Sequence, residues 1–91
     1  MSLIILNGRR MTDKTAAHAY IKRRLRFPEY YGANLDALAD CLGELGRRKS
    51  IVLINADRMR GQLGDYAESL LEVFKELSAA PDSFSFRISG E

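Results

Sequence analysis

Residues Phe27 to Leu45 read FPEYYGANLDALADCLGEL, a proline-containing loop that feeds a short amphipathic helix. The stretch contains four carboxylates and neither lysine nor arginine, whereas the whole chain of 91 residues carries a formal charge of +2. It therefore places a local acidic field on a mildly basic protein. That contrast makes this stretch the first candidate for a functional surface.

The helix in this stretch is predicted to begin at Leu35, because the side chain of Asn34 can accept an amide proton of the first turn. Apolar side chains then recur at helical spacing and predict a buried stripe of Leu35, Leu38, Leu42 and Leu45, with Cys41 beside it. Asp36, Asp40 and Glu44 follow one another at intervals of four on the other side. Such a row is compatible with an ordinary solvated face as well as with a binding surface.

The segment PEYYGANLDAL at Pro28 to Leu38, followed by Asp40-Cys41-Leu42, resembles the signature of the barstar family, the intracellular protein inhibitors of the ribonuclease barnase. The likeness is looser elsewhere and rests on a first apolar strand ending at Asn7-Gly8 and on a late helix containing Glu68-Ser69 and 73–76. It implies an α/β fold with a small three-stranded parallel sheet and about four helices.

Patterning of the remaining chain predicts the same class. Leu3 to Leu6 and Ile51 to Ile54 are continuous apolar runs, typical of strands buried on both faces, and 84–88 alternate as a third strand. Strands separated by helical connections form a parallel sheet. Residues 1–91 are expected to form a single domain.

Three further elements are predicted between these strands. Thr12 or Asp13 can cap a first helix that turns Ala17, Tyr20, Ile21 and Leu25 inward and ends before Pro28, while His18 falls on its polar flank as a surface residue. Residues 56–64 are expected to form a short helical turn and a loop. Asp65 and Glu68 have the spacing of a capping box that would start the last helix. This helix exposes a second acidic row of Glu68, Glu72 and Glu76.

The composition limits the other function classes. One cysteine cannot form an internal disulfide, and no apolar run is long enough to span a membrane, so a soluble cytoplasmic protein is expected. Neither a glycine-rich phosphate loop nor paired zinc ligands occur. Exposed aspartates on a helix also lack the burial that acid catalysis requires. We therefore expect no enzyme activity, no cofactor and no metal site.

Exposed carboxylates on a rigid helix suit a protein interface better. Asp36 and Asp40 lie one helical turn apart, at roughly 6 Å, close to the spacing of neighbouring phosphates in RNA. They could pair with the cations of a ribonuclease active site without offering a cleavable bond. The resemblance implies a partner-binding surface of Tyr30, Gly32, Asn34, Leu35, Asp36, Asp40 and Glu76, with Asp40 as the central contact.

Three features depart from the family pattern. Ala39 stands where the family has a tryptophan beside the interface, Ala80 stands where it has an acid, and the charge of +2 replaces a strongly acidic total. Steering toward a basic nuclease should therefore be weaker. The expected partner is an extracellular-type ribonuclease or a related toxin, less basic than barnase, and the free protein is expected to be monomeric.

Two alternatives remain open at this level. The first keeps the fold without inhibition of barnase, as a regulatory interaction domain or as an immunity protein for another toxin. The second is a weak nucleic-acid-binding module built on the basic cluster at 22–26. The chain has 14 basic and 12 acidic residues, so its charge is nearly balanced, and no aromatic residues lie within the basic cluster. Direct nucleic-acid binding is therefore not expected.

Overall fold

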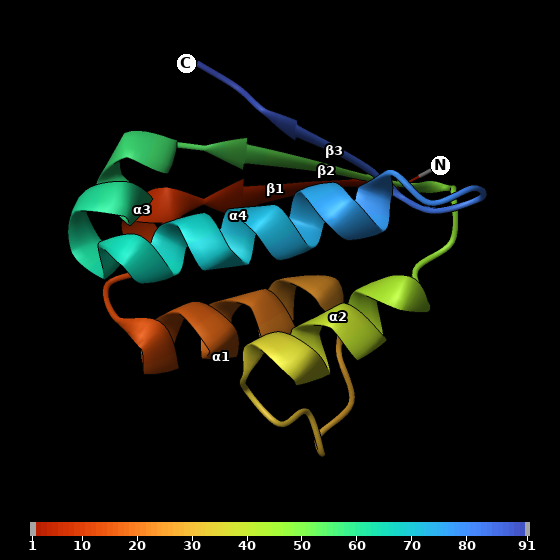
Figure 1. The fold of residues 1–91 in the computed structure, drawn as a ribbon, viewed down its shortest axis with the longest axis horizontal. Coiled ribbons are helices and arrows are strands. Elements are labelled where there is room, and N and C mark those ends of the chain that lie inside the picture. The colour runs from red at the N-terminus through yellow and green to blue at the C-terminus, as the bar shows by residue number, and fades with distance from the viewer. Residues whose placement is uncertain (1, 91) are drawn as a thin grey trace.

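The structure, a computed structural model, describes residues 2–90. Its elements in chain order are β1 (Ser2–Asn7), a 3-10 turn (Gly8–Arg10), α1 (Lys14–Leu25), α2 (Leu35–Gly43), β2 (Lys49–Ile54), α3 (Ala56–Leu63), α4 (Asp65–Ser78) and β3 (Ser85–Ile88). Figure 1 shows α1, α2 and α4 on one side of the sheet and α3 at one end of it. No helix within residues 2–90 is both long enough and apolar enough to cross a membrane.

The three strands form one parallel sheet in the order β1-β2-β3, which confirms the predicted α/β class. Ile4 pairs with Ile51, which pairs with Phe86, and the next inward row is Leu6, Leu53 and Ile88. These rows turn toward the helices and contribute to the hydrophobic core. Every second side chain along each strand thus points to the face of the sheet on which the helices pack.

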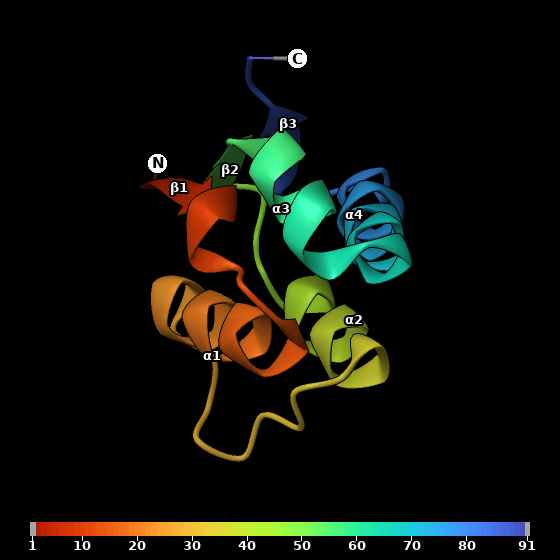
Figure 2. The same cartoon turned by 90° about the vertical axis from the view of Figure 1, so that its left-hand side faces the viewer.

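The prediction that the first strand is buried on both faces is wrong. Leu3 and Ile5 are 65% and 41% exposed, whereas Leu6 on the opposite face of the strand is buried. The reason is the layering that Figure 2 makes visible: the helices gather on one face of the sheet and leave the other face uncovered. A continuous apolar run is usual for a strand covered on both sides, and this small sheet lacks the second layer.

The first helix follows its prediction closely. The side chain of Asp13 accepts a hydrogen bond from the amide of Ala16 at 2.8 Å, so Asp13 is the N-cap. The helix ends at Leu25, and Arg26 adopts a left-handed conformation with φ of 58° that turns the chain away before Pro28. The predicted inward residues Ala17, Tyr20, Ile21 and Leu25 are all buried.

The segment before α4 differs from its prediction. Residues 56–63 form a complete helix, α3, rather than a turn and a loop, and Gly64 with φ of 61° then redirects the chain into α4. The predicted capping box is absent, because Gly64 occupies the cap position and Glu68 instead accepts a hydrogen bond from Arg60 at 2.9 Å. Glu68 is thereby tied to α3 and taken out of the acidic row.

Candidate functional site

The loop that joins α1 to α2 lies on the side of these helices away from the sheet (Figure 1). It begins with a turn in which the amide of Tyr31 donates to the carbonyl of Pro28 at 3.0 Å. The two neighbouring tyrosines then take opposite roles, because Tyr30 is 87% exposed while Tyr31 is buried against Phe27. Tyr30 thus projects a large aromatic ring into solvent from a loop that its neighbour anchors.

The end of the loop is fixed by Asn34, the predicted N-cap of α2. Its Oδ1 accepts from the amide of Ala37 at 2.8 Å, and its Nδ2 donates to the carbonyl of Gly32 at 3.3 Å. A Cβ atom on Gly32 would lie 3.3 Å from the Cβ of Ala37, a tight contact that the loop or the helix would have to relieve by a shift of a few tenths of an ångström. Asn34 and Gly32 therefore hold the shape of the loop against α2.

Ala33, between these two residues, adopts a left-handed conformation with φ of 53°. A non-glycine residue in that conformation costs about 1 kcal/mol or more, which the surrounding contacts must offset. The hydrogen bonds of Asn34 on one side and the buried Tyr31 on the other provide such contacts. The loop is consequently held in a defined, strained shape.

Helix α2 presents two carboxylates next to this loop. Leu38 and Leu42 are fully buried, as predicted, so the opposite side of the short helix exposes Asp36 and Asp40. Neither carboxylate has an ion-pair partner among residues 2–90. Asp36 is favoured by its place in the first turn, whereas Asp40 lies in the last turn, where the helix dipole opposes a negative charge.

A shallow groove of about 220 Å³ separates α2 from α4 and brings Leu35 together with Glu76. Its other lining residues are Ser69, Glu72 and Val73. Glu76 is exposed in the last turn of α4, a second position at which the dipole disfavours a carboxylate, and it lacks an ion pair within residues 2–90. We call Tyr30, Gly32, Asn34, Leu35, Asp36, Asp40 and Glu76 the acidic surface.

Glu72 belongs to the same groove, although the sequence singled it out only as part of the acidic row. Its interval of four residues from Glu76 was the available signal. Glu68 lies at the same interval of four before Glu72, so the spacing could not separate the two residues. The structure does so, because Glu72 lines the groove whereas Glu68 binds Arg60.

Two comparisons with known proteins bear on the role of this surface. The family model described as Barstar (barnase inhibitor) matches residues 1–89. The chain belongs to the barstar family. It is also 43% identical over 77 residues to the Bacillus subtilis (strain 168) protein named "Putative ribonuclease inhibitor YrdF", an alignment covering 84% of this chain and 85% of that protein. The resemblance drawn from the sequence is thus confirmed, and both descriptions support a role like that of a barnase inhibitor.

Cys41 reports the electrostatic character of the acidic surface in this barstar-family chain. Burial raises the pKa of the thiol, and the carboxylates of Glu44 and Asp40 raise it further. The thiolate is therefore disfavoured, and the cysteine behaves as a packing residue on α2. Within residues 2–90, no group of three or more histidine, cysteine or acidic side chains is arranged to hold a metal ion.

The prediction that His18 is a surface residue is wrong, because its side chain is buried and only 1% exposed. Its Nδ1 lies 2.7 Å from the hydroxyl oxygen of Tyr31, and its Nε2 lies 2.7 Å from that of Tyr66. Lys14 is exposed with its ammonium over the Tyr66 ring, and Lys22 reaches Glu29 at 3.5 Å. The His18 ring instead turns inward and lies between the hydroxyls of Tyr31 and Tyr66. Tyr31 is likewise part of the core, at 9% exposed.

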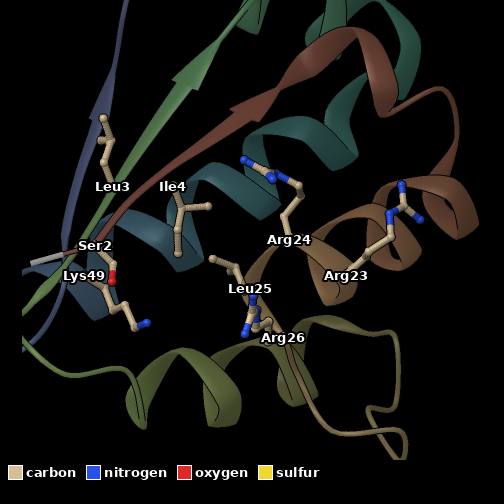
Figure 3. A pocket seen from close by; sticks show the side chains of 8 residues that line it. All are labelled: Ser2, Leu3, Ile4, Arg23, Arg24, Leu25, Arg26 and Lys49. Carbon is tan, nitrogen blue, oxygen red and sulfur yellow. The ribbon is translucent and has the colours of Figure 1, made fainter.

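A second charged region, the basic pocket, lies where the last turn of α1 meets the edge strand β1 (Figure 3). The pocket measures about 490 Å³, and its charged lining residues are Arg23, Arg24, Arg26 and Lys49. Arg24 donates two hydrogen bonds to the carbonyl of Ile5 at 3.0 and 3.2 Å. The guanidinium of Arg23 lies 5.8 Å from the ring centre of Tyr20.

Proposed function

We propose that this barstar-family protein is a cytoplasmic inhibitor of a barnase-type ribonuclease, and that it blocks the enzyme's active site with the acidic surface. The observation that carries the proposal is the placement of Asp40 and Glu76. Both carboxylates are exposed and without ion pairs among residues 2–90, and both lie in the last turn of a helix, where local electrostatics disfavour them. Carboxylates that do not stabilise the free protein are available to bind cations of another protein.

Several other acids within residues 2–90 have ion-pair partners, in contrast to Asp40 and Glu76. Glu29 pairs with Lys22, Glu68 with Arg60, and Asp82 with Arg47. Asp40 and Glu76 thus differ from these paired acids, and they share exposure without an ion pair within residues 2–90 with Glu44 and Glu72. In a chain of net charge +2, the acidic surface must act at short range.

The proposed mechanism is occupation of the phosphate-binding positions of the nuclease. A ribonuclease active site gathers arginine, lysine and histidine to bind RNA phosphates, and carboxylates one helical turn apart, at roughly 6 Å, can occupy the same positions. Asp40 is assigned the central position and Asp36 the adjacent one. Hydrogen bonds from guanidinium to carboxylate are short and directional, and they strengthen as water is excluded. The helix offers no phosphodiester bond to cleave.

The loop supplies contact area and shape. Tyr30, 87% exposed on a strained and anchored loop, is a rigid aromatic that can enter a pocket at little cost in conformational entropy. Gly32 allows the loop backbone to approach the partner closely. Leu35 contributes an apolar contact at the groove in which Glu76 also lies.

The identity of the target is a separate part of the proposal. Ala39 provides less contact area than the tryptophan of the family pattern, and the net charge of +2 reduces long-range attraction to a basic enzyme. We therefore expect a nuclease less basic than barnase. An immunity role against a related toxin would use the same surface and differ only in the partner.

The test is a titration of the protein into a barnase-type ribonuclease during RNA cleavage, beside the Asp40→Ala variant. The matched control is Asp57→Ala, which removes an exposed carboxylate from α3, at the far end of the sheet from α2 (Figure 1). Stoichiometric inhibition by the parent and by Asp57→Ala, lost in Asp40→Ala, is expected. Equal inhibition by all three proteins would contradict the mechanism, and absence of inhibition by all three would contradict a barnase-type target.

A further inference from the structure

The hydrogen bonds of His18 join three separate parts of the chain. His18 comes from the middle of α1, Tyr31 from the loop of the acidic surface, and Tyr66 from the first turn of α4. Both ring nitrogens lie 2.7 Å from a hydroxyl oxygen, and no buried side-chain nitrogen or oxygen among residues 2–90 lacks a hydrogen-bond partner. We call this set the Tyr–His–Tyr clamp.

Tyr31 connects the clamp to the acidic surface. Tyr31 stands directly between Tyr30 and Gly32, both members of that surface, and it is the buried anchor of the loop. The Phe27 ring packs against it at 5.0 Å between ring centres. The neighbouring Ala33 is strained, so loss of the anchor would allow the loop to relax toward other conformations.

The clamp is sensitive to the proton count of the imidazole. A neutral histidine donates through one nitrogen and accepts through the other, so one tyrosine accepts and the other donates. A protonated histidine donates through both nitrogens, and both hydroxyls must then accept. The tyrosine that had donated would have to point its own hydrogen elsewhere, which is harder for Tyr31, which is buried, than for Tyr66, which is only partly buried.

The groups around His18 offer no compensation for a positive charge. The loop contributes Tyr31, α4 contributes Tyr66, and α1 contributes the Lys14 ammonium, which lies 4.7 Å from the centre of the Tyr66 ring. Helix α2 brings Cys41 near Tyr31, and the Cys41 thiol is kept neutral by burial and by nearby carboxylates that raise its pKa. Within residues 2–90, no carboxylate hydrogen-bonds to His18.

We propose that His18 is a positioning residue for the partner-binding loop, and that its protonation in mild acid releases Tyr31 and weakens binding through the acidic surface. The inference rests on the proposed function for its effect on inhibition. The release of the loop itself is a property of the free protein and can be measured without any partner.

The sign of the pH dependence follows from burial. Desolvation lowers the pKa of His18 below the ordinary value of 6.5, so the folded protein takes up this proton less readily than the unfolded chain does. Stability from the clamp is therefore complete above pH 6.5 and decreases as the pH falls from 6.5 to the folded-state pKa. Below the folded-state pKa, this contribution no longer changes.

The first arm of the test follows the free protein by nuclear magnetic resonance between pH 8 and pH 4. We expect the protection of the Tyr31 amide, which donates to Pro28, and of the Ala37 amide, which donates to Asn34, to fall as the His18 ring titrates, when exchange is compared with the intrinsic rate at each pH. This step should be missing in His18→Gln, whose side chain stays neutral. Tyr66→Phe removes only one hydroxyl and should raise the pH at which the step occurs or remove the step. Protection of these two amides that is unchanged while His18 titrates would overturn the proposal.

The second arm measures the affinity for the nuclease at pH 7.5 and pH 5 for the parent and for His18→Gln. Titration of the nuclease affects both proteins equally, so the readout is the ratio of the two losses in affinity. We expect the parent to lose roughly fivefold to tenfold more than the variant, a typical size for coupling between sites. Equal losses would overturn the coupling to binding. If the nuclease is not bound at all, the proposed function fails, and the first arm still decides the clamp.

Discussion

The acidic surface and the basic pocket carry opposite charges, and they differ in how the free protein uses those charges. Figure 2 shows α1 and β1 toward one side of the molecule and α2 and α4 toward the other. On the α1 side, the last turn holds Lys22, Arg23 and Arg24, where cations complement the helix dipole, and Arg24 also binds the carbonyl of Ile5. These charges serve the fold.

The acidic surface shows the reverse. Asp40 and Glu76 occupy last-turn positions where the dipole opposes them, and neither finds a cation within residues 2–90. The difference teaches that the sign of the net charge, +2, is a poor guide to function here. A charge that stabilises its own helix needs no partner, whereas a charge that destabilises it calls for another explanation.

The largest expected effect is on the central contact. Asp40→Ala should weaken the complex with the nuclease by about 2–5 kcal/mol, because it leaves the enzyme's cations buried without a counter-charge. The loss should appear mainly as faster dissociation, measured by stopped-flow kinetics. Unchanged dissociation would remove Asp40 from the interface and with it the contrast between the two surfaces.

Smaller losses are expected at the flanks of the acidic surface. Asp36→Ala and Glu76→Ala should each cost about 1–2 kcal/mol of binding free energy, since contacts away from the centre are better hydrated. Calorimetry on each variant, with Asp57→Ala as the reference, would measure these losses. A loss at Asp57 as large as those at Asp36 and Glu76 would mean that the total charge, rather than the surface, governs binding.

The basic pocket should respond in the opposite way. Arg24→Ala should lower the free energy of unfolding by about 1 kcal/mol through the lost hydrogen bonds to Ile5, while the affinity for the nuclease stays the same. Urea denaturation and the inhibition titration measure the two quantities on one sample. Loss of inhibition with unchanged stability would place the functional surface at the basic pocket. Salt-sensitive RNA binding lost in Arg23→Ala would instead support the nucleic-acid alternative.

The smallest effect tests the dipole argument itself. Asp40→Asn and Glu76→Gln should raise the free energy of unfolding of the free protein by a few tenths of a kcal/mol, because each removes a negative charge from a helix C-terminus. Thermal unfolding at low salt would detect the gain, and salt should reduce it. A decrease in stability would show that these carboxylates serve the fold after all.

Much of the fold could be predicted from the sequence because it depends on local patterns. The cap at Asn34, the buried leucines of α2 and the three strands follow from side-chain chemistry and periodicity within a few residues. The same reasoning located the loop and helix of the candidate site. Local patterns could not show that Leu3 and Ile5 face solvent, because an apolar run does not indicate whether helices cover one face of the sheet or both.

His18 shows most clearly what sequence patterns miss. Its spacing from Lys14 and Lys22 predicted a polar flank, but its partners are Tyr31 and Tyr66, 13 and 48 residues away along the chain. Only tertiary packing brings these hydroxyls to the ring. The groove that joins Leu35 to Glu76 has the same origin, because it depends on how α2 packs against α4.

The most direct test of the central claim is competition for the active site of the nuclease. The affinity of the protein for a barnase-type ribonuclease would be measured at increasing concentrations of a nucleoside monophosphate that occupies the phosphate-binding positions. If the acidic surface takes those positions, the apparent dissociation constant should rise in proportion to the nucleotide concentration. A dissociation constant that stays the same at saturating nucleotide would place the contact elsewhere on the enzyme and contradict the account.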